Sequence, residues 1–256
     1  MLHTVSHHGD RTAISTPLVI AHGLFGSARN WGVISRRLSG SRDVVAVDMR
    51  NHGQSDWFDH HSYADMAADL SDVIAAHAGR ADILGHSMGG KAAMVLALTR
   101  PEVVRRLIVA DIAPVAYGHT QSHLIHAMRR LECDRIQTRR DADELLSGEI
   151  DDVATRAFLL QSLDIKTTPP RWRLNLAALE RNMVDITGFP EVGATFSGPT
   201  LFLKGSSSDY ILDEHRNRIE ALFPNSRIET IQDAGHWLHA ENPHALEAAI
   251  HRFLSA

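Results

Sequence analysis

A strand that turns directly into a helix through Gly-x-Ser-x-Gly constrains this chain more than any other feature. The run DILGHSMGGKAAMVLAL (82–98) begins apolar, breaks at Gly85, Ser87 and Gly89, and continues as a strong helix former. The small residues leave room for a tight turn that exposes the Ser87 hydroxyl, and the helix places its positive N-terminal end beside it. The run therefore predicts a nucleophile elbow. Because the same pattern occurs in ordinary glycine-rich turns, the prediction depends on partners elsewhere in the chain.

Short apolar runs alternate with amphipathic stretches along most of the sequence. The expected strands are 18–21, 44–47, 83–84, 107–110, 200–203 and 228–231. Nearly continuous apolar strands separated by helices predict an α/β fold with a mostly parallel central sheet and helices on both faces. In such sheets the ligand site lies beyond the carboxyl ends of the strands. The serine turn follows one of those ends.

The alternation stops between about Tyr117 and Pro190, where apolar residues take helical spacing and no strand is expected. The spaced positions are Leu124, Met128 and Leu131, then Trp172, Leu176, Leu179 and Met183. Acidic residues at 141–144 and 151–152 resemble helix starts. The sequence therefore predicts an α/β core of residues 1–117 and 191–256, with residues 118–190 inserted as a helical cap over the strand ends. The alternative is that these helices extend the core.

A second loop, HGLFG (22–26), directly follows a predicted strand. Its glycines allow the backbone N–H groups to turn toward Ser87. We expect the Leu24 N–H and the Met88 N–H to form an oxyanion hole. The Phe25 N–H is the alternative to the Leu24 N–H. A plain glycine turn would have the same sequence.

The third element is the loop QDAGHW (232–237) after the last predicted strand. His236 comes last in the order serine, acid, histidine, and a neutral imidazole there would act as the general base for Ser87. Asp111 and Asp209 are the candidate acids. Asp111 ends a strand and is held more rigidly, whereas Asp209 could instead cap the helix that begins near Asp213. Geometry favours Asp111 and leaves Asp209 open.

Charge and composition exclude some classes of binding partner. The chain has 26 basic and 31 acidic residues, a net charge of −5 and no long basic run, so neither nucleic acid nor a membrane surface is an expected partner. No segment is apolar for the length of a bilayer span, and no targeting signal is recognised. The single cysteine, Cys133, forms no internal disulfide and fits a cytoplasmic location. We expect a small-molecule substrate, and the sequence specifies no oligomeric state.

Seventeen histidines raise the question of a metal site. His7–His8 and His60–His61 are adjacent pairs in polar stretches and lack the spacing and acidic neighbours that metal ligands usually have. We expect surface histidines and no bound metal.

Five stretches carry a family resemblance: HGLFGS (22–27), DMRNHGQS (48–55), GHSMGGK (85–91), ADIAPV (110–115) and AGHWLHAE (234–241). With them the chain resembles the α/β-hydrolase superfamily, and more closely its bacterial YbfF-type esterases and their mitochondrial abhydrolase relatives. The resemblance covers the predicted core, whereas the cap is similar only in length and position. It implies a serine esterase or thioesterase, with long-chain acyl thioesters among its substrates and no cofactor.

The resemblance also bears on the acid. In this subfamily the carboxylate follows the sixth strand, which matches Asp111, and a serine stands at the usual later acid position, which Ser208 matches. Asp209 beside that serine departs from the subfamily and leaves open a role for Asp209, or a contact of Ser208 with His236. Asp48 and Arg50 are expected to hold loops by charge-assisted bonds.

These residues predict hydrolysis of an ester or thioester through an acyl-enzyme on Ser87. Two alternatives share the motifs. One is another serine hydrolase of the same fold, such as a carbon–carbon bond hydrolase or a lactonase. The other is a hydrolase-derived ligand receptor with slow turnover.

Overall fold

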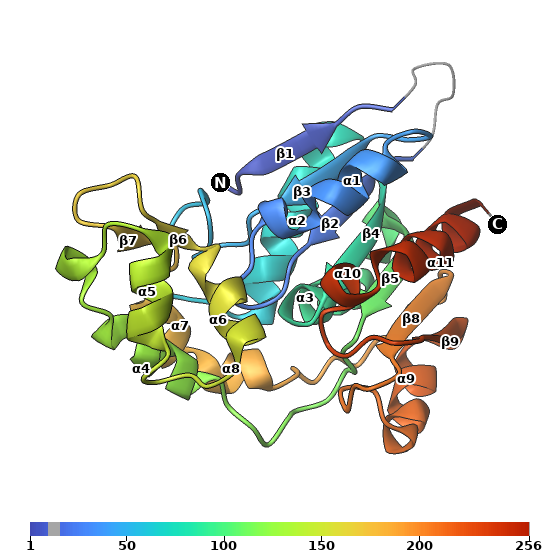
Figure 1. The fold of residues 1–256 in the computed structure, drawn as a ribbon. Helices are drawn as coiled ribbons and strands as arrows, with labels where there is room; N and C mark the ends of the chain where they lie inside the picture. The colour runs from blue at the N-terminus through green and yellow to red at the C-terminus, as the bar shows by residue number, and fades with distance from the viewer. Residues whose placement is uncertain (10–15, 256) are drawn as a thin grey trace.

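A twisted seven-stranded sheet forms the centre of the computed structural model, which describes residues 1–9 and 16–255 (Figure 1). Its strands are β1 (Thr4–His7), β2 (Leu18–Ala21), β3 (Val44–Val47), β4 (Ala81–His86), β5 (Val104–Ala110), β8 (Thr200–Gly205) and β9 (Ser226–Ile231). The order is β1-β3-β2-β4-β5-β8-β9, and only β1 runs antiparallel to its neighbour. The six expected strands are confirmed. β1 was not expected, because it is a mostly polar edge strand.

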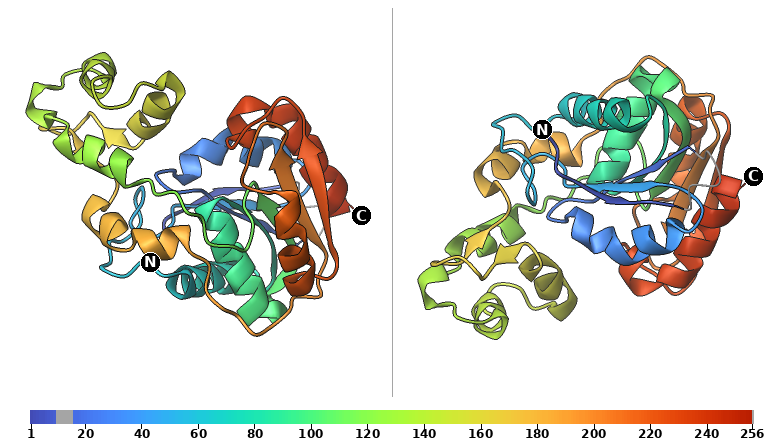
Figure 2. Two further views of the ribbon diagram at one scale, coloured as in Figure 1. Left: turned by 90° about the horizontal axis from the view of Figure 1, so that it is seen from below. Right: turned by 90° about the horizontal axis from the view of Figure 1, so that it is seen from above.

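Alternate residues of each strand pack against helices on opposite faces of the sheet. Leu18 and Ile20 pack in one cluster with α1 (Gly32–Leu38) and α11 (Pro243–Ser255). Val19 and Ala21 pack in the other with α2 (Tyr63–His77) and α3 (Met88–Thr99). Figure 2 shows these two helix pairs on opposite sides of the strands. Because both faces are covered, the strands are apolar throughout, as the sequence predicts.

The strand order places a crevice beside the serine turn. The chain passes from β2 to β3 on one side and then crosses to β4 on the other side of β2. The loops after β2 and β4 therefore leave the sheet in opposite directions, and ligands bind in such a gap. Both the HGLFG loop and Ser87 lie at this point.

Residues 118–190, which we call the cap segment, lie between β5 and β8 and add no strand to the main sheet. Its elements are α4 (Ser122–Arg130), α5 (Arg139–Leu146), α6 (Val153–Leu160), β6 (Leu163–Asp164), β7 (Arg171–Trp172), α7 (Leu176–Arg181) and α8 (Met183–Thr187), with the short turn η3 (Cys133–Arg135). Figures 1 and 2 show α4 to α7 on one side of the sheet. The acidic helix starts are confirmed: Asp141 completes a capping box with Thr138, and Asp152 accepts from the Thr155 N–H at 2.7 Å.

One expectation for this segment is wrong. β6 and β7 pair antiparallel, so the segment contains strands, and Trp172 lies on β7 rather than on a helix. Two-residue strands are too short to show a period, which is why the sequence pattern missed them. The β6–β7 pair, residues 162–174, is called the cap hairpin below.

The remaining elements connect the sheet to its surface helices. They are η1 (Ala28–Trp31), η2 (Pro101–Val103), η4 (Asp213–His215), α9 (Arg216–Leu222) and α10 (Leu238–Glu241). In the part of the chain that the structure describes, no helix has the length and apolar character needed to cross a membrane.

Candidate active site

Ser87 stands in the sharp turn between β4 and α3. Its φ is +51°, a conformation rarely adopted by residues with a side chain, and its N–H donates to Ala110 O at 3.0 Å. A Cβ at Gly85 would lie 2.2 Å from Gly89 O, and one at Gly89 would lie 2.4 Å from Ala21 O. The turn therefore requires both glycines, because β2, β4 and α3 meet there in backbone contact.

Strained backbone gathers at this end of the sheet. Within residues 1–9 and 16–255, the non-glycine residues with positive φ are Phe25, Asn51, Ser87, Asp111 and Asp233. Each lies in the loop that follows a strand, respectively β2, β3, β4, β5 and β9. Such conformations cost free energy and cluster at functional sites. The pattern marks the carboxyl ends of the strands as the candidate site.

His236 is brought to Asp111. His236 Nδ1 lies 2.8 Å from Asp111 Oδ2, and the Asp111 side chain is fully buried. Asp111 also accepts from the Gly205 N–H at 2.9 Å and from the Ser208 hydroxyl. Ser208 thus contacts the carboxylate and not the imidazole. These bonds fix the position of the Asp111 carboxylate. Because the carboxylate holds His236 Nδ1, the other ring nitrogen, Nε2, is available to accept a proton.

Asp209 lies apart from this group. Its side chain is exposed, and among the described residues it makes no hydrogen bond or ion pair. It does not cap the following helical turn either, because Leu212 holds that position. Of the two candidate acids, only Asp111 reaches His236.

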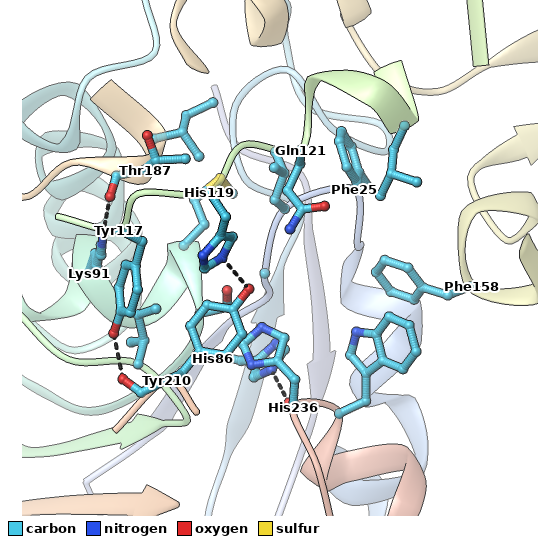
Figure 3. Close-up of a pocket in the computed structure, with 18 of the residues that line it drawn as sticks. Phe25, His86, Lys91, Tyr117, His119, Gln121, Phe158, Thr187, Tyr210 and His236 are labelled. Atoms are coloured by element: carbon cyan, nitrogen blue, oxygen red, sulfur yellow. Dashed lines mark hydrogen bonds between the residues drawn. The ribbon is translucent and has the colours of Figure 1, made fainter. Parts of the chain in front are cut away.

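Aromatic rings and a second histidine fix the His236 loop. Tyr210 stacks on the His236 ring with centroids 4.0 Å apart, and His86 Nε2 donates to the His236 carbonyl at 2.8 Å (Figure 3). Burial lowers the pKa of His86 well below its ordinary value, so the ring stays neutral. The Glu241 carboxylate accepts from the Gly235 and Trp237 N–H groups. Sequence reasoning assigned no role to Tyr210, whose only signal is its place two residues after Ser208.

The HGLFG loop forms a turn closed by the Gly26 N–H on Gly23 O at 3.0 Å. Within the described part of the chain, neither the Leu24 N–H nor the Met88 N–H has a hydrogen-bond acceptor. Both residues line the same cavity as Ser87. The Phe25 N–H, the alternative donor, instead donates to His52 Nε2 at 3.1 Å. The N–H groups of Leu24 and Met88 are therefore the two donors available to an oxyanion.

Three buried histidines lie behind this turn. His22 donates from Nδ1 to Gly23 O at 2.8 Å, and His52 donates from Nδ1 to Arg50 O at 2.8 Å. His61 contacts Met88 Sδ through Nε2 at 3.3 Å. Burial lowers their pKa values to about 4, 3 and 2 respectively, so all three are neutral.

The expectation that His60 and His61 are both surface residues is wrong for His61. His60 is exposed, but His61 is completely buried and contacts Met88 of α3. A pair of adjacent histidines gives no indication of which one faces inward. Asp48 and Arg50 do hold loops, as expected: Asp48 accepts from the Ala28 N–H at 2.7 Å, and Arg50 binds Asp69 at 2.6 Å.

A cavity of about 390 Å³ lies over Ser87 and His236. Its remaining walls are largely apolar and come from both the core and the cap segment, including Leu124, Phe158 and Ile186. Figure 3 shows Phe25 of the core and Phe158 of the cap segment among them. This size is in the range of small-molecule sites. No group of three or more His, Cys, Asp or Glu side chains that could hold a metal occurs among the described residues.

Lys91 lies at the inner wall of this cavity, four residues after Ser87. It is 1% exposed, and its Nζ donates to Thr187 O at 2.9 Å and to Gly188 O at 2.6 Å. Tyr117 presents its ring 4.7 Å from the Nζ. Burial lowers the pKa of Lys91 to about 7. The lysine fastens the end of the cap segment to α3.

Comparisons with known proteins agree on the family. A model described as the alpha/beta hydrolase family matches residues 18–249. The chain is 41% identical to the sn-1-specific diacylglycerol lipase ABHD11 of Danio rerio, over 94% of this chain and 78% of that protein. It is 36% identical to esterase YbfF of Escherichia coli K12, over 94% of each chain. A solved marine microorganism esterase superposes with a TM-score of 0.92 at 37% identity, covering 98% of each chain.

The sheet, the serine turn and these similarities lead to one assignment. The chain belongs to the alpha/beta hydrolase family and is an esterase or lipase of that family.

Proposed function

We propose that this protein hydrolyses carboxylic esters of apolar acyl groups, and the corresponding acyl thioesters, through an acyl-enzyme on Ser87. The observation that carries the proposal is the 2.8 Å contact between His236 Nδ1 and the buried Asp111 carboxylate. Because this contact occupies Nδ1, Nε2 is the nitrogen that serves as the base. Ser87 and His236 line the same cavity. No cofactor is needed for this chemistry.

The reaction proceeds by two acyl transfers. His236 Nε2 takes the proton of the Ser87 hydroxyl while Oγ bonds to the substrate carbonyl carbon, and the carbonyl oxygen becomes an oxyanion. The N–H groups of Leu24 and Met88 donate to that oxygen. The C–O or C–S bond then breaks, and the alcohol or thiol leaves with the proton from His236. Water repeats the sequence, releasing the carboxylic acid and restoring Ser87.

The cavity favours an apolar acyl chain. Leu124, Phe158 and Ile186 of the cap segment face the same space as the nucleophile. The relatives named as diacylglycerol lipases and esterases act on carboxylic esters, which agrees with this lining. We infer that the acyl chain lies under the cap segment, which acts as a lid over residues 1–117 and 191–256.

The test is turnover of acyl esters and acyl-CoA thioesters of increasing chain length by wild type and Ser87→Ala. We expect Ser87→Ala to lose at least about a thousandfold in kcat, because the nucleophile is absent, while retaining the wild-type unfolding temperature. Ser206→Ala, an exposed serine of the loop after β8, is the matched control and should remain active.

A fluorophosphonate probe gives a second readout, since it should label wild type and Ser206→Ala but not Ser87→Ala. Equal turnover by wild type and Ser87→Ala on every substrate would refute the proposal. Single-turnover labelling without steady-state hydrolysis would favour a ligand receptor, and preference for lactones or carbon–carbon cleavage would favour the other serine hydrolases.

A further inference from the structure

Both polar backbone groups of Phe25 are held by segments outside its own loop. The Phe25 N–H donates to His52 Nε2 at 3.1 Å, and the Phe25 carbonyl accepts from Ser162 Oγ at 2.8 Å. His52 belongs to the loop after β3, and Ser162 belongs to the cap hairpin. None of the three residues is more than 5% exposed, so water does not replace either bond. The residue after Leu24 is therefore clamped from two sides.

The turn needs such a clamp. Phe25 has φ +64°, a left-handed conformation that residues with a Cβ disfavour. It stands at the third position of the Gly23–Gly26 turn, where a positive φ is typical of type II. If Phe25 relaxed to a negative φ, the Leu24–Phe25 peptide would rotate and the Gly23–Gly26 turn would change shape. Because the Leu24 N–H is carried by this turn, its position depends on what holds Phe25.

The neighbouring peptide shows which direction is selected. Gly23 O accepts from His22 Nδ1 and from the Gly26 N–H, which turns this carbonyl away from Ser87's cavity and into the protein. In a trans peptide the Leu24 N–H points opposite to the Gly23 carbonyl. Among the described residues this N–H has no acceptor, and Leu24 lines the cavity.

The two clamping residues are themselves connected. Ser162 O accepts from the Arg173 N–H at 2.8 Å, and Arg173 O accepts from the Gly53 N–H at 2.8 Å. Gly53 directly follows His52, and His52 forms a β-bridge with Leu174. The hydrogen bonds thus form a closed circuit through the HGLFG turn, the loop after β3 and the cap hairpin.

We propose that Ser162 and His52 are positioning residues that hold Phe25 so that the Leu24 N–H faces the substrate oxyanion. The cap hairpin therefore supports the oxyanion hole, while other residues of the cap segment line the cavity. This inference rests on the proposed function, because it requires a tetrahedral oxyanion formed on Ser87.

The decisive variant is Ser162→Ala, which removes one hydroxyl and little volume. We expect kcat to fall roughly tenfold to a hundredfold, less than or equal to the loss from deleting an oxyanion donor, with KM within about twofold. A trifluoromethyl ketone, which forms a tetrahedral adduct with the serine, reports the oxyanion hole directly. Its affinity should fall by the same factor as kcat/KM, a correlation that a merely structural role would not produce.

Controls separate position from chemistry. Ser147→Ala removes another cap-segment hydroxyl, one that donates to Glu144 O at 2.7 Å at the end of α5, and should leave kcat and inhibitor affinity unchanged. At His52, Gln can place an amide oxygen near the position of Nε2, whereas Leu has no acceptor. His52→Gln should therefore retain more kcat than His52→Leu. Unfolding temperatures of all variants identify any loss caused by misfolding.

The outcomes distinguish the two proposals. If Ser87→Ala is inactive but Ser162→Ala keeps wild-type kcat and inhibitor affinity, the clamp is wrong and the serine mechanism stands. A rise in KM at unchanged kcat would also overturn the clamp, because it would place Ser162 in substrate binding. If Ser87→Ala remains active, the mechanism itself fails, whatever the behaviour of Ser162→Ala.

Discussion

At the scale of single residues, burial separates groups that look equivalent in the sequence. Asp111 and Asp209 both follow strands, yet Asp111 is buried against His236 and Asp209 is exposed. His60 and His61 are neighbours, yet only His61 is buried. The chemistry available to each residue follows from these positions, because a buried carboxylate with fixed donors orients an imidazole and an exposed one does not.

This contrast predicts the effects of two matched substitutions. Asp111→Asn should lower kcat by roughly ten-thousandfold, because the amide cannot hold the His236 tautomer as the carboxylate does. Asp209→Asn should remain within about twofold of wild type. Steady-state kinetics on one ester, with unfolding temperatures recorded in parallel, checks both. A larger loss in Asp209→Asn would make Asp209 the acid.

Lys91 predicts a pH dependence of stability. Burial lowers its pKa from 10.5 to about 7. Between these values the unfolded chain binds more protons than the folded protein, so the destabilisation from Lys91 is complete below pH 7 and decreases as pH rises. The free energy of unfolding of wild type relative to Lys91→Met should therefore increase by about 2 kcal/mol from pH 7 to pH 9.

Denaturant unfolding at the two pH values measures this difference. Lys166→Met, at an exposed position of the cap hairpin, controls for the loss of one lysine from the chain. If the free energies of unfolding of wild type and Lys91→Met differ by the same amount at pH 7 and pH 9, burial does not lower the pKa of Lys91.

At the scale of elements, the site depends on how closely β2, β4 and α3 approach. A Cβ at Gly89 would lie 2.4 Å from Ala21 O and 2.5 Å from His22 O, both backbone atoms that side-chain rotation cannot move. Gly89→Ala must push α3 away from β2 and displace the Met88 N–H. The element contact that shapes the turn also places the oxyanion donor.

Gly89→Ala should therefore destabilise the fold by roughly 1–3 kcal/mol and reduce kcat in the protein that remains folded. Gly148→Ala is the control, because its added Cβ would approach no atom closer than 3.8 Å. Urea unfolding and kinetics at a temperature where both variants are folded provide the measurement. Equal stability of the two variants would contradict the packing argument.

At the scale of the whole molecule, stability and catalysis occupy opposite ends of the sheet. Asp82 near the start of β4 is fully buried and binds Arg42 at 3.0 Å and Arg105 at 2.8 Å, whereas Ser87 follows the other end of the same strand. Removing one member of a buried ion pair leaves the others uncompensated. The amino-terminal end of the sheet therefore supports the fold without touching the cavity.

Asp82→Ala should cost roughly 3–5 kcal/mol in the free energy of unfolding and leave kcat/KM of the folded enzyme within about twofold. Asp213→Ala, which breaks an exposed pair with Arg216, should cost less than about 1 kcal/mol. Unfolding curves and kinetics on both variants test this division. A large drop in kcat/KM for folded Asp82→Ala would show that the two ends of the sheet are coupled.

The sequence by itself determined the elements with strong local signals. Continuous apolar runs specified the parallel strands, and the glycines around Ser87 specified the turn, because only small residues fit where strand and helix meet. Chain order and strand ends brought Asp111 and His236 into consideration. Short or polar elements escaped, since β1, β6 and β7 have too few apolar residues to form a period.

Tertiary structure decided everything that depends on contacts between distant segments. Only the folded structure shows that Asp111 rather than Asp209 reaches His236. It also shows that the Phe25 N–H donates to His52 and that the Phe25 carbonyl accepts from Ser162. These pairings join residues 27 to 137 positions apart. A local pattern records the propensity of each segment, but the partner of a hydrogen bond is set by how the cap segment and the sheet pack together.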